Sequence, residues 1–173
     1  MLNDGYAEHI VKSKTPISVL LGMALGIVTI IAGFGSFMMV PGMAALGLLI
    51  TIIGAVIFGL FVSRKETEYE YIMVNEDVEI ARIVAKKSRK SIYTFCNGDV
   101  KLITKDGSIY LDNEQQQNSS IKVRDFTSKD SAYEEGVYVF VVNKNGRTEF
   151  VKLELSDKTI DHVNSFFKGK YKQ

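Results

Sequence analysis

The sequence predicts an α+β membrane protein, in which a transmembrane helical hairpin precedes an antiparallel β-barrel or sandwich of about seven strands with a C-terminal helix. Three observations predict this fold class. Residues 15–63 contain no charged side chain. Residues 66–155 contain short runs that alternate between apolar and polar side chains, as half-buried strands do. Residues 156–168 repeat apolar side chains at helical spacing.

The charge-free stretch is long enough to cross a bilayer twice. Pro41 and Gly42 divide it into two apolar spans, at about 17–40 and 43–62. A helix of about 20 residues, rising 1.5 Å per residue, crosses a hydrocarbon core of about 30 Å. Pro41 cannot continue the helical hydrogen bonds and Gly42 tolerates a positive φ, so a tight reversal fits between the spans.

Two other interpretations of this stretch fit less well. A secretory signal has an apolar region of only about 7 to 15 residues, and here a second apolar run follows directly. A buried hairpin of a soluble bundle would show a polar stripe on each helix. Only Thr29, Ser36 and Thr51 interrupt the spans, and their hydroxyls can bond to carbonyls of their own helix.

Cationic residues flank the two spans on one side only. Lys12 and Lys14 precede the first span and Arg64 and Lys65 follow the second, whereas residues 38–44 carry no charge. Lys and Arg are retained on the cytoplasmic side of a membrane. We therefore expect a two-span protein of the cell membrane with both termini in the cytoplasm.

This topology predicts the domain boundaries. Residues 1–14 are a short cytoplasmic N-terminus, either frayed or lying along the headgroup layer, and residues 15–63 are the transmembrane hairpin. Residues 64–173 form a cytoplasmic β-rich domain that ends in a helix at 156–168. The single cysteine, Cys96, precludes an internal disulfide, fits a reducing compartment and is expected to be a small buried residue on a strand.

Turn residues separate the predicted strands. Asp106-Gly107 and Asn145-Gly146 are hairpin turns, because these residue pairs tolerate positive φ angles. Residues 112–120 are polar, with nothing to bury, and are expected to be a loop. Residues 78–95 fit two strands joined by a basic turn at 86–90, with a short helix as the alternative. The other predicted strands are 66–75, 100–104, 108–111, 121–126, 136–143 and 147–155.

The C-terminal helix is predicted from its caps and its apolar face. Ser156 is a good N-cap, and Gly169 supplies a stop. His162 is assigned to the solvent-facing side. Asp157 and Asp161 share that side, and the apolar face consists of Ile160, Val163, Phe166 and Phe167.

This order of elements resembles a pleckstrin-homology-like domain, in which a C-terminal helix closes one end of an antiparallel barrel. Its attachment to a membrane hairpin is similar to bacterial membrane proteins that carry that fold. The chain also resembles a family of small bacterial two-span proteins of unknown function, on the hairpin, Tyr69-Glu70-Tyr71 and residues 78–90. The resemblance implies no activity and no functional residues.

One departure and one alternative fold accompany this resemblance. Phosphoinositide-binding members of the fold rely on a basic loop after the first strand, whereas the loop after the first predicted strand, Asn75-Glu76-Asp77, is acidic. The alternative is an oligonucleotide/oligosaccharide-binding-type barrel behind membrane spans, as in some membrane-protease partners. The terminal helix argues against that alternative.

Small residues recur at a spacing of four on both predicted spans. Such pairs allow helix backbones to approach closely, within the hairpin or, as a second use, between copies in a homo-oligomer. They are Gly22 and Gly26 in the first span, and Gly47, Thr51, Ala55 and Gly59 in the second.

The sequence offers little for catalysis. His9 and His162 are the only histidines, and neither lies in a metal-spaced cluster with cysteine or carboxylates. No Gly-rich phosphate loop or nucleophile elbow is present. We expect no enzyme activity, no metal and no cofactor. The near-neutral charge, with 21 Lys and Arg against 20 Asp and Glu, does not suggest nucleic acid.

One charged run exceeds the background, with four cations in five residues: Lys86, Lys87, Arg89 and Lys90. It is either a solvated turn or a contact with the anionic inner leaflet, where each cation contributes about 1 kcal/mol. The expected function is a non-enzymatic membrane-anchored interaction module that binds a protein partner or the inner membrane surface. The alternatives are an accessory subunit of a transporter or envelope complex that acts through the hairpin and, less favoured, an unrecognised membrane enzyme.

Overall fold

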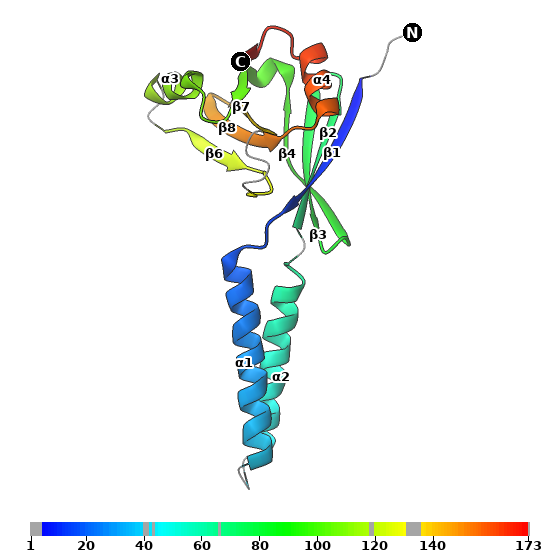
Figure 1. The fold of residues 1–173 in the computed structure, drawn as a ribbon, viewed down its shortest axis with the longest axis vertical. Coiled ribbons are helices and arrows are strands. Elements are labelled where there is room, and N and C mark those ends of the chain that lie inside the picture. Colours follow the sequence, from blue (N-terminus) through cyan, green and yellow to red (C-terminus); the bar gives the residue numbers. More distant parts are fainter. Residues whose placement is uncertain are drawn as a thin grey trace. The chain divides into compact units, whose positions relative to one another are not determined.

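The computed structural model describes residues 5–39, 42, 44–65, 67–117, 120–130 and 136–172 (Figure 1). The chain divides into two compact units, one that holds the helical hairpin (residues 15–67, grouped with 84–87) and one that is β-rich. Residues 5–14 belong to the β-rich domain although they precede the hairpin in sequence. The hairpin is therefore an insertion within the chain of the β-rich domain.

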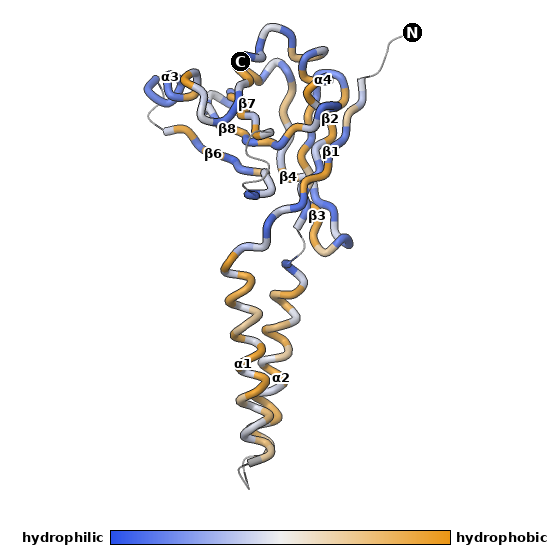
Figure 2. The backbone as a smooth tube through the Cα atoms, viewed as in Figure 1, coloured by the Kyte–Doolittle hydropathy of each residue, from blue (hydrophilic) through white to orange (hydrophobic). Residues whose placement is uncertain are grey.

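Helices α1 (Ile17–Met39) and α2 (Ala44–Val62) form the hairpin, which confirms the two predicted apolar helices. Both are long and apolar enough to cross a membrane, by length and composition. Figure 2 shows hydrophobic residues along both helices, and many large apolar side chains are exposed, such as Leu21 and Ile31. Pro41 of the predicted reversal lies outside the described residues, and Gly42 has a φ of +89°.

The first sheet of the domain has four strands in the order β1-β2-β3-β4, and the second has five in the order β6-β8-β7-β5-β9. β7 pairs antiparallel with β5 and β8, whereas β6 and β9 run parallel to β8 and β5. The strands are β1 (Tyr6–Ser13), β2 (Thr67–Val74), β3 (Asp77–Val84), β4 (Ser88–Cys96), β5 (Val100–Lys105), β6 (Lys122–Asp125), β7 (Val137–Lys144), β8 (Arg147–Glu154) and β9 (Tyr171–Lys172). The helices of the domain are η1 (Asn97–Asp99), α3 (Ile109–Gln117) and α4 (Asp157–Phe166).

The two sheets and α4 share one hydrophobic core. Tyr71 of the first sheet and Phe140 of the second are both fully buried in it. The Tyr71 hydroxyl donates a 2.7 Å hydrogen bond to the Phe126 carbonyl oxygen, which satisfies its one buried polar group. On α4, Val163 is buried and Ile160 and Phe166 are partly buried, and Phe167, the C-cap residue, is fully buried, so the predicted apolar face of this helix is confirmed.

The prediction that residues 1–14 are frayed or interfacial is wrong for the described part. Residues 6–13 form β1, which pairs beside β2 in the first sheet. The Asn75 amide donates to the Gly5 carbonyl oxygen at 2.8 Å, so the start of β1 lies at the end of β2. Ala7 and Val11 point into the core and are buried. Their even spacing fits a strand with one buried face, but the segment is too short for this pattern to predict a strand from the sequence alone.

The prediction for residues 108–120 is also wrong. Residues 109–117 form α3 in place of a strand and a polar loop. The helix buries only Leu111 and Glu114 within a polar sequence, so its apolar periodicity is weak. Lys101 of β5 forms a 2.7 Å ion pair with Glu114, and the Ser108 hydroxyl accepts a bond from the Tyr110 amide.

Residues 77–96 form two strands, as favoured, and not a helix. Within the described chain the domain has nine strands and not about seven, because β1 and the short β9 were not predicted. The hairpin around Asn145-Gly146 is confirmed, with positive φ at both residues.

Candidate functional site

The basic run begins in a tight turn between β3 and β4. Ala85 and Lys86 both have positive φ angles, of 51° and 55°, and the Lys87 amide donates to the Val84 carbonyl oxygen at 3.1 Å. Positive φ at both central residues is the geometry of a two-residue type I′ turn. Lys86 and Lys87 are exposed there.

Arg89 and Lys90, the other two cations of the run, lie on β4. The Arg89 guanidinium pairs with Glu70 of β2 and, at 3.3 Å, with Glu79 of β3. The hydrogen bond that Arg89 donates to Glu70 is the main cause that raises the pKa of Arg89. Lys86, Lys87 and Lys90 are exposed, and in the described part of the chain none of them has an ion pair. The predicted four-cation surface therefore offers three cations that are not already neutralised.

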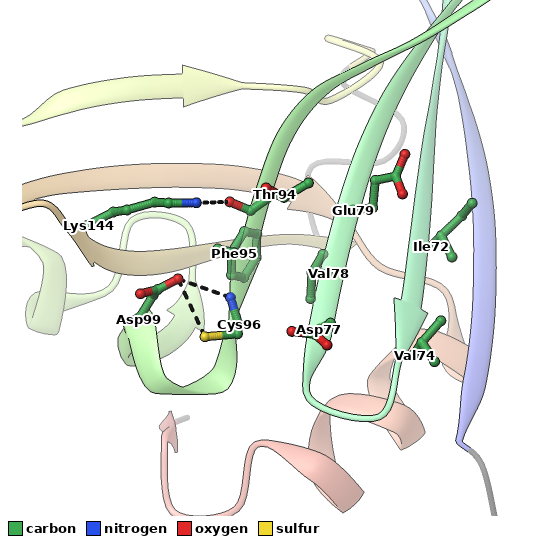
Figure 3. Close-up of a pocket in the computed structure, with 10 residues that line it drawn as sticks. All are labelled: Ile72, Val74, Asp77, Val78, Glu79, Thr94, Phe95, Cys96, Asp99 and Lys144. Atoms are coloured by element: carbon green, nitrogen blue, oxygen red, sulfur yellow. Dashed lines mark hydrogen bonds between the residues drawn. The ribbon is translucent and has the colours of Figure 1, made fainter.

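A groove of about 420 Å³ opens on the first sheet (Figure 3). Its apolar lining includes Ile72 and Val74, and its carboxylates are Asp77, Glu79 and Asp99. This lining suits a ligand that combines an apolar group with a positive charge. The remaining described residues that line it are Val78, Thr94, Phe95, Cys96 and Lys144.

Cys96 lies in this groove at the end of β4. Its Sγ is 3.5 Å from Asp99 Oδ2, and its backbone amide donates to the same oxygen at 3.1 Å (Figure 3). The prediction that Cys96 lies on a strand is confirmed, but the residue is partly exposed and not buried.

The two histidines do not lie where the sequence suggested. His162 is buried, not solvent-facing, and its Nε2 is 2.8 Å from the Asn75 carbonyl oxygen. Its ring also stacks on Phe166, with 4.6 Å between centroids. His9 lies on β1, partly buried, with its ring centroid 6.1 Å from that of Tyr71. Among the described residues, no group of three or more His, Cys, Asp or Glu could hold a metal ion.

Glycines line the contact between α1 and α2. A Cβ placed at Gly26 would lie 2.8 Å from the Phe58 backbone nitrogen, and one at Gly47 would lie 2.5 Å from the Phe37 nitrogen. Gly22 faces the Phe61 ring in the same way. The predicted small residues Gly22, Gly26 and Gly47 are thus placed where the helices meet.

The same contact includes two glycines that the spacing of four did not identify. A Cβ at Gly33 would lie 2.5 Å from the Thr51 backbone nitrogen, and one at Gly54 would lie 2.7 Å from the Ile30 nitrogen. Gly26 with Gly33, and Gly47 with Gly54, are seven residues apart, a heptad spacing that could have revealed them. Ala55 and Gly59 do not share this role, since both are exposed and a Cβ at Gly59 would meet nothing within 4 Å.

The family model for a bacterial PH-like domain (DUF6106) matches residues 3–173, which include the hairpin and both sheets. The chain belongs to this family. The resemblance to bacterial pleckstrin-homology-like domains is thereby confirmed, and the alternative barrel is set aside. No curated protein and no solved structure matches the chain significantly. For this DUF6106 protein, the PH-like fold suggests a non-enzymatic interaction module.

The first strand of this PH-like domain is β1, and this changes one comparison with the fold. The connection after the first strand is the segment 14–66, which contains both apolar helices. The acidic turn at Asn75-Glu76-Asp77 follows the second strand and is not its counterpart. In this DUF6106 protein, the connection after β1 therefore holds the helical hairpin.

Proposed function

We propose that this DUF6106 protein is a non-enzymatic interaction module, anchored in the cell membrane by its hairpin, whose cytoplasmic PH-like domain docks on the anionic inner leaflet. The observation that carries the proposal is the insertion of two apolar helices between neighbouring strands β1 and β2. The Thr15 hydroxyl donates to the Lys65 carbonyl oxygen at 3.2 Å, so the two ends of the hairpin meet. A domain held by two short connections is tethered more tightly than one held by a single linker.

The cations of the β3–β4 turn supply the attraction to the leaflet. Each cation near an anionic surface contributes about 1 kcal/mol, so Lys86, Lys87 and Lys90 together supply about 3 kcal/mol. Arg89 adds little, because Glu70 and Glu79 already neutralise its charge. An attraction of this size orients a tethered domain without selecting one lipid species.

The membrane anchor and its topology are tested by thiol labelling in a Cys96→Ser background. A cysteine at Gly42 is expected to react with an impermeant reagent in intact cells, whereas a cysteine at Asn145 reacts only after lysis. The charge bias of the flanks predicts this pattern. Labelling of Asn145→Cys alone in intact cells would contradict the cytoplasmic domain, and labelling of both would contradict the anchor.

Docking is tested with a spin label at Ser88, an exposed residue of the basic run, in the full chain reconstituted in nanodiscs. Anionic lipid is expected to lower the label's access to a water-soluble relaxation agent, compared with neutral lipid. Salt is expected to restore access, because the attraction acts within a Debye length of about 10 Å. Lys86→Gln/Lys87→Gln/Lys90→Gln is expected to abolish the difference.

A second label, at exposed Asn164 of α4, is the control for a general change of the domain. Equal access of the Ser88 label in neutral and anionic nanodiscs would rule out leaflet docking. The anchor could still be correct in that case, because the topology experiment tests it separately.

A second candidate function, an accessory subunit acting through the hairpin, rests on Ala55 and Gly59. These small residues lie on α2 but are exposed, so they remain available to a helix of another protein or another copy. Gly59→Leu would then release a partner that copurifies with the full chain in mild detergent. Retention of that partner by Gly59→Leu would favour the module.

A further inference from the structure

A second cationic surface lies on the five-stranded sheet of the domain. It is a cavity of about 640 Å³ and an adjoining one of about 320 Å³, which share Arg124, Arg147 and Glu149 as lining residues. We call both together the β6–β8 groove. Its other described lining residues are Tyr93, Gln117, Ser120, Lys122, Lys144, Asn145, Gly146 and Thr148.

The groove carries an excess of positive charge. Its described lining contains four cations, Lys122, Arg124, Lys144 and Arg147, and one carboxylate, Glu149. β6 and β8 run parallel, and Lys122 is the register partner of Glu149. Parallel pairing thus brings basic residues of β6 beside the start of β8, although about 25 residues separate them in sequence.

Arg124 is fixed at the centre of the groove. It donates from Nε to Glu149 Oε2 at 2.6 Å and from a terminal nitrogen to Oε1 at 2.9 Å. Its guanidinium lies 4.5 Å from the centroid of the Tyr93 ring, and the Tyr93 hydroxyl also donates to Glu149 at 2.6 Å. A guanidinium has five N–H donors, so this bidentate pair leaves others for a further acceptor.

The carboxylate of Glu149 is paired with Arg124 and also accepts the hydrogen bond from Tyr93. The hydrogen bond from Arg124 is the main cause that lowers the pKa of Glu149, and the same bond raises the pKa of Arg124. The pair therefore stays ionised at neutral pH, and its two charges cancel. The positive charge of the remaining cations is left without an opposing carboxylate in the described lining.

Those remaining cations are Lys122, Lys144 and Arg147. Lys122 and Arg147 are exposed and have no ion pair among the residues that the structure describes. Lys144 Nζ donates to the Thr94 carbonyl oxygen at 2.7 Å, which positions the ammonium without neutralising it (Figure 3). Arg124 and Lys144 are held in place by hydrogen bonds, and Lys122 and Arg147 are exposed beside them. Such a set of cations suits a compact group with several negative oxygens.

We propose that the β6–β8 groove binds a phosphate group carried by a small molecule or by a lipid headgroup. The volumes of its two cavities, about 640 and 320 Å³, lie in the range of about 300 to 1,000 Å³ that small-molecule sites occupy. Arg124 and Arg147 supply planar N–H donors, and Lys122 and Lys144 supply charge. None of these residues belongs to the basic run at 86–90, so the proposal stands apart from leaflet docking.

The experiment is a calorimetric titration of the full chain, held in nanodiscs of neutral phosphatidylcholine, with inorganic pyrophosphate. The wild type is expected to bind pyrophosphate saturably. Lys122→Gln/Arg147→Gln is expected to weaken binding by about tenfold or more, because two charge-assisted contacts are lost. Both residues are exposed and unpaired in the described chain, so their replacement is expected to leave the fold intact.

The matched control is Lys86→Gln/Lys87→Gln, which removes an equal number of positive charges, but from the β3–β4 turn. This control is expected to bind pyrophosphate like the wild type. Absence of saturable binding by the wild type would overturn the proposal. Equal weakening by the two double variants would also overturn it, because binding would then follow net charge and not the groove.

A second arm distinguishes the two sources of phosphate. Nanodiscs that contain phosphatidic acid present a phosphate group, as a monoester, on a lipid. If they weaken pyrophosphate binding by the wild type, but not the residual binding by Lys122→Gln/Arg147→Gln, the ligand is a lipid headgroup. Unchanged pyrophosphate affinity in these nanodiscs identifies a soluble phosphorylated molecule, and both results support a phosphate site.

Discussion

Phe167 is the residue through which α4 closes the core. Its side chain is fully buried, and its ring meets Phe140 edge to face with 6.2 Å between centroids. Phe167→Ala is expected to lower the free energy of unfolding by about 3 to 5 kcal/mol, because it removes a large buried side chain and leaves a cavity. Asp161→Ala, at an exposed position of the same helix, is expected to change it by less than about 0.5 kcal/mol.

Urea unfolding of the full chain in detergent, followed by the near-ultraviolet circular dichroism of its tyrosines, measures both effects. Small and equal effects of Phe167→Ala and Asp161→Ala would mean that α4 is not docked on the core.

His162 links α4 to the turn between β2 and β3 through the Asn75 carbonyl oxygen. Burial lowers the pKa of His162 below 6.5 and outweighs the opposite effect of the bond to Asn75. The unfolded chain then binds the proton more readily than the folded one. Stability is therefore complete above the unfolded pKa, near 6.5, and is lost as the pH falls below it toward the lower folded pKa.

His162→Gln keeps an N–H donor near Asn75 but does not titrate. It is expected to lose less unfolding free energy than the wild type when the pH falls from about 7.5 to about 5. His9→Gln is the companion variant and is expected to act in the same direction, because burial also lowers the pKa of His9. The double variant is expected to show the smallest loss, and equal losses in all four proteins would contradict the buried neutral state of His162.

At the scale of elements, the helical hairpin is held by glycines that leave no room for a side chain. Gly33→Ala would place a Cβ 2.5 Å from the Thr51 backbone nitrogen, so the helices must separate. We expect a lower unfolding temperature in detergent and faster proteolysis of the hairpin. Gly59→Ala, with nothing within 4 Å, is the matched control on α2 and is expected to behave like the wild type.

A Gly33→Ala variant as stable as Gly59→Ala would show that the contact between α1 and α2 lies on other faces. Oligomer size, measured by light scattering in the same detergent, separates this effect from self-association. A change of oligomer size with Gly59→Ala alone would assign the exposed small residues to contacts between copies.

At the scale of the whole molecule, the domain needs the segment before the hairpin as well as the one after it. Replacing residues 16–64 by a short Gly/Ser loop retains β1, and the 3.2 Å bond between Thr15 and Lys65 shows that such a loop can close. This protein is expected to be soluble and to unfold cooperatively. A fragment that begins at Thr67 lacks Ala7 and Val11 of the core and is expected to unfold at a clearly lower temperature.

The measurement is thermal unfolding of the two soluble proteins side by side. Equal stability of both would contradict the role of β1 in the first sheet. Failure of both to fold would show that the domain depends on the hairpin itself.

The sequence by itself determined the features whose information is local. A stretch of 49 residues without charge, from Thr15 to Ser63, determines two apolar helices, because a helix satisfies the backbone hydrogen bonds of such a segment within itself. Asn145-Gly146 determines a hairpin turn, since both residues must adopt positive φ. Ile160, Val163 and Phe167 determine the buried face of α4 through their helical spacing.

Only the tertiary structure decided the features that depend on a distant partner. β1 is a strand because it pairs with β2, which lies more than 50 residues further along the chain. α3 has a weak apolar periodicity, since it buries little beyond Leu111 and Glu114. Arg89 is neutralised by Glu70 and Glu79, and Arg124 is held by Glu149 and Tyr93, across separate strands. Local periodicity indicates which element a segment forms, whereas pairing between segments depends on the fold that brings them together. The basic turn is continuous in sequence, so its charge alone identified it. The β6–β8 groove combines residues from separate strands, so the sequence did not reveal it.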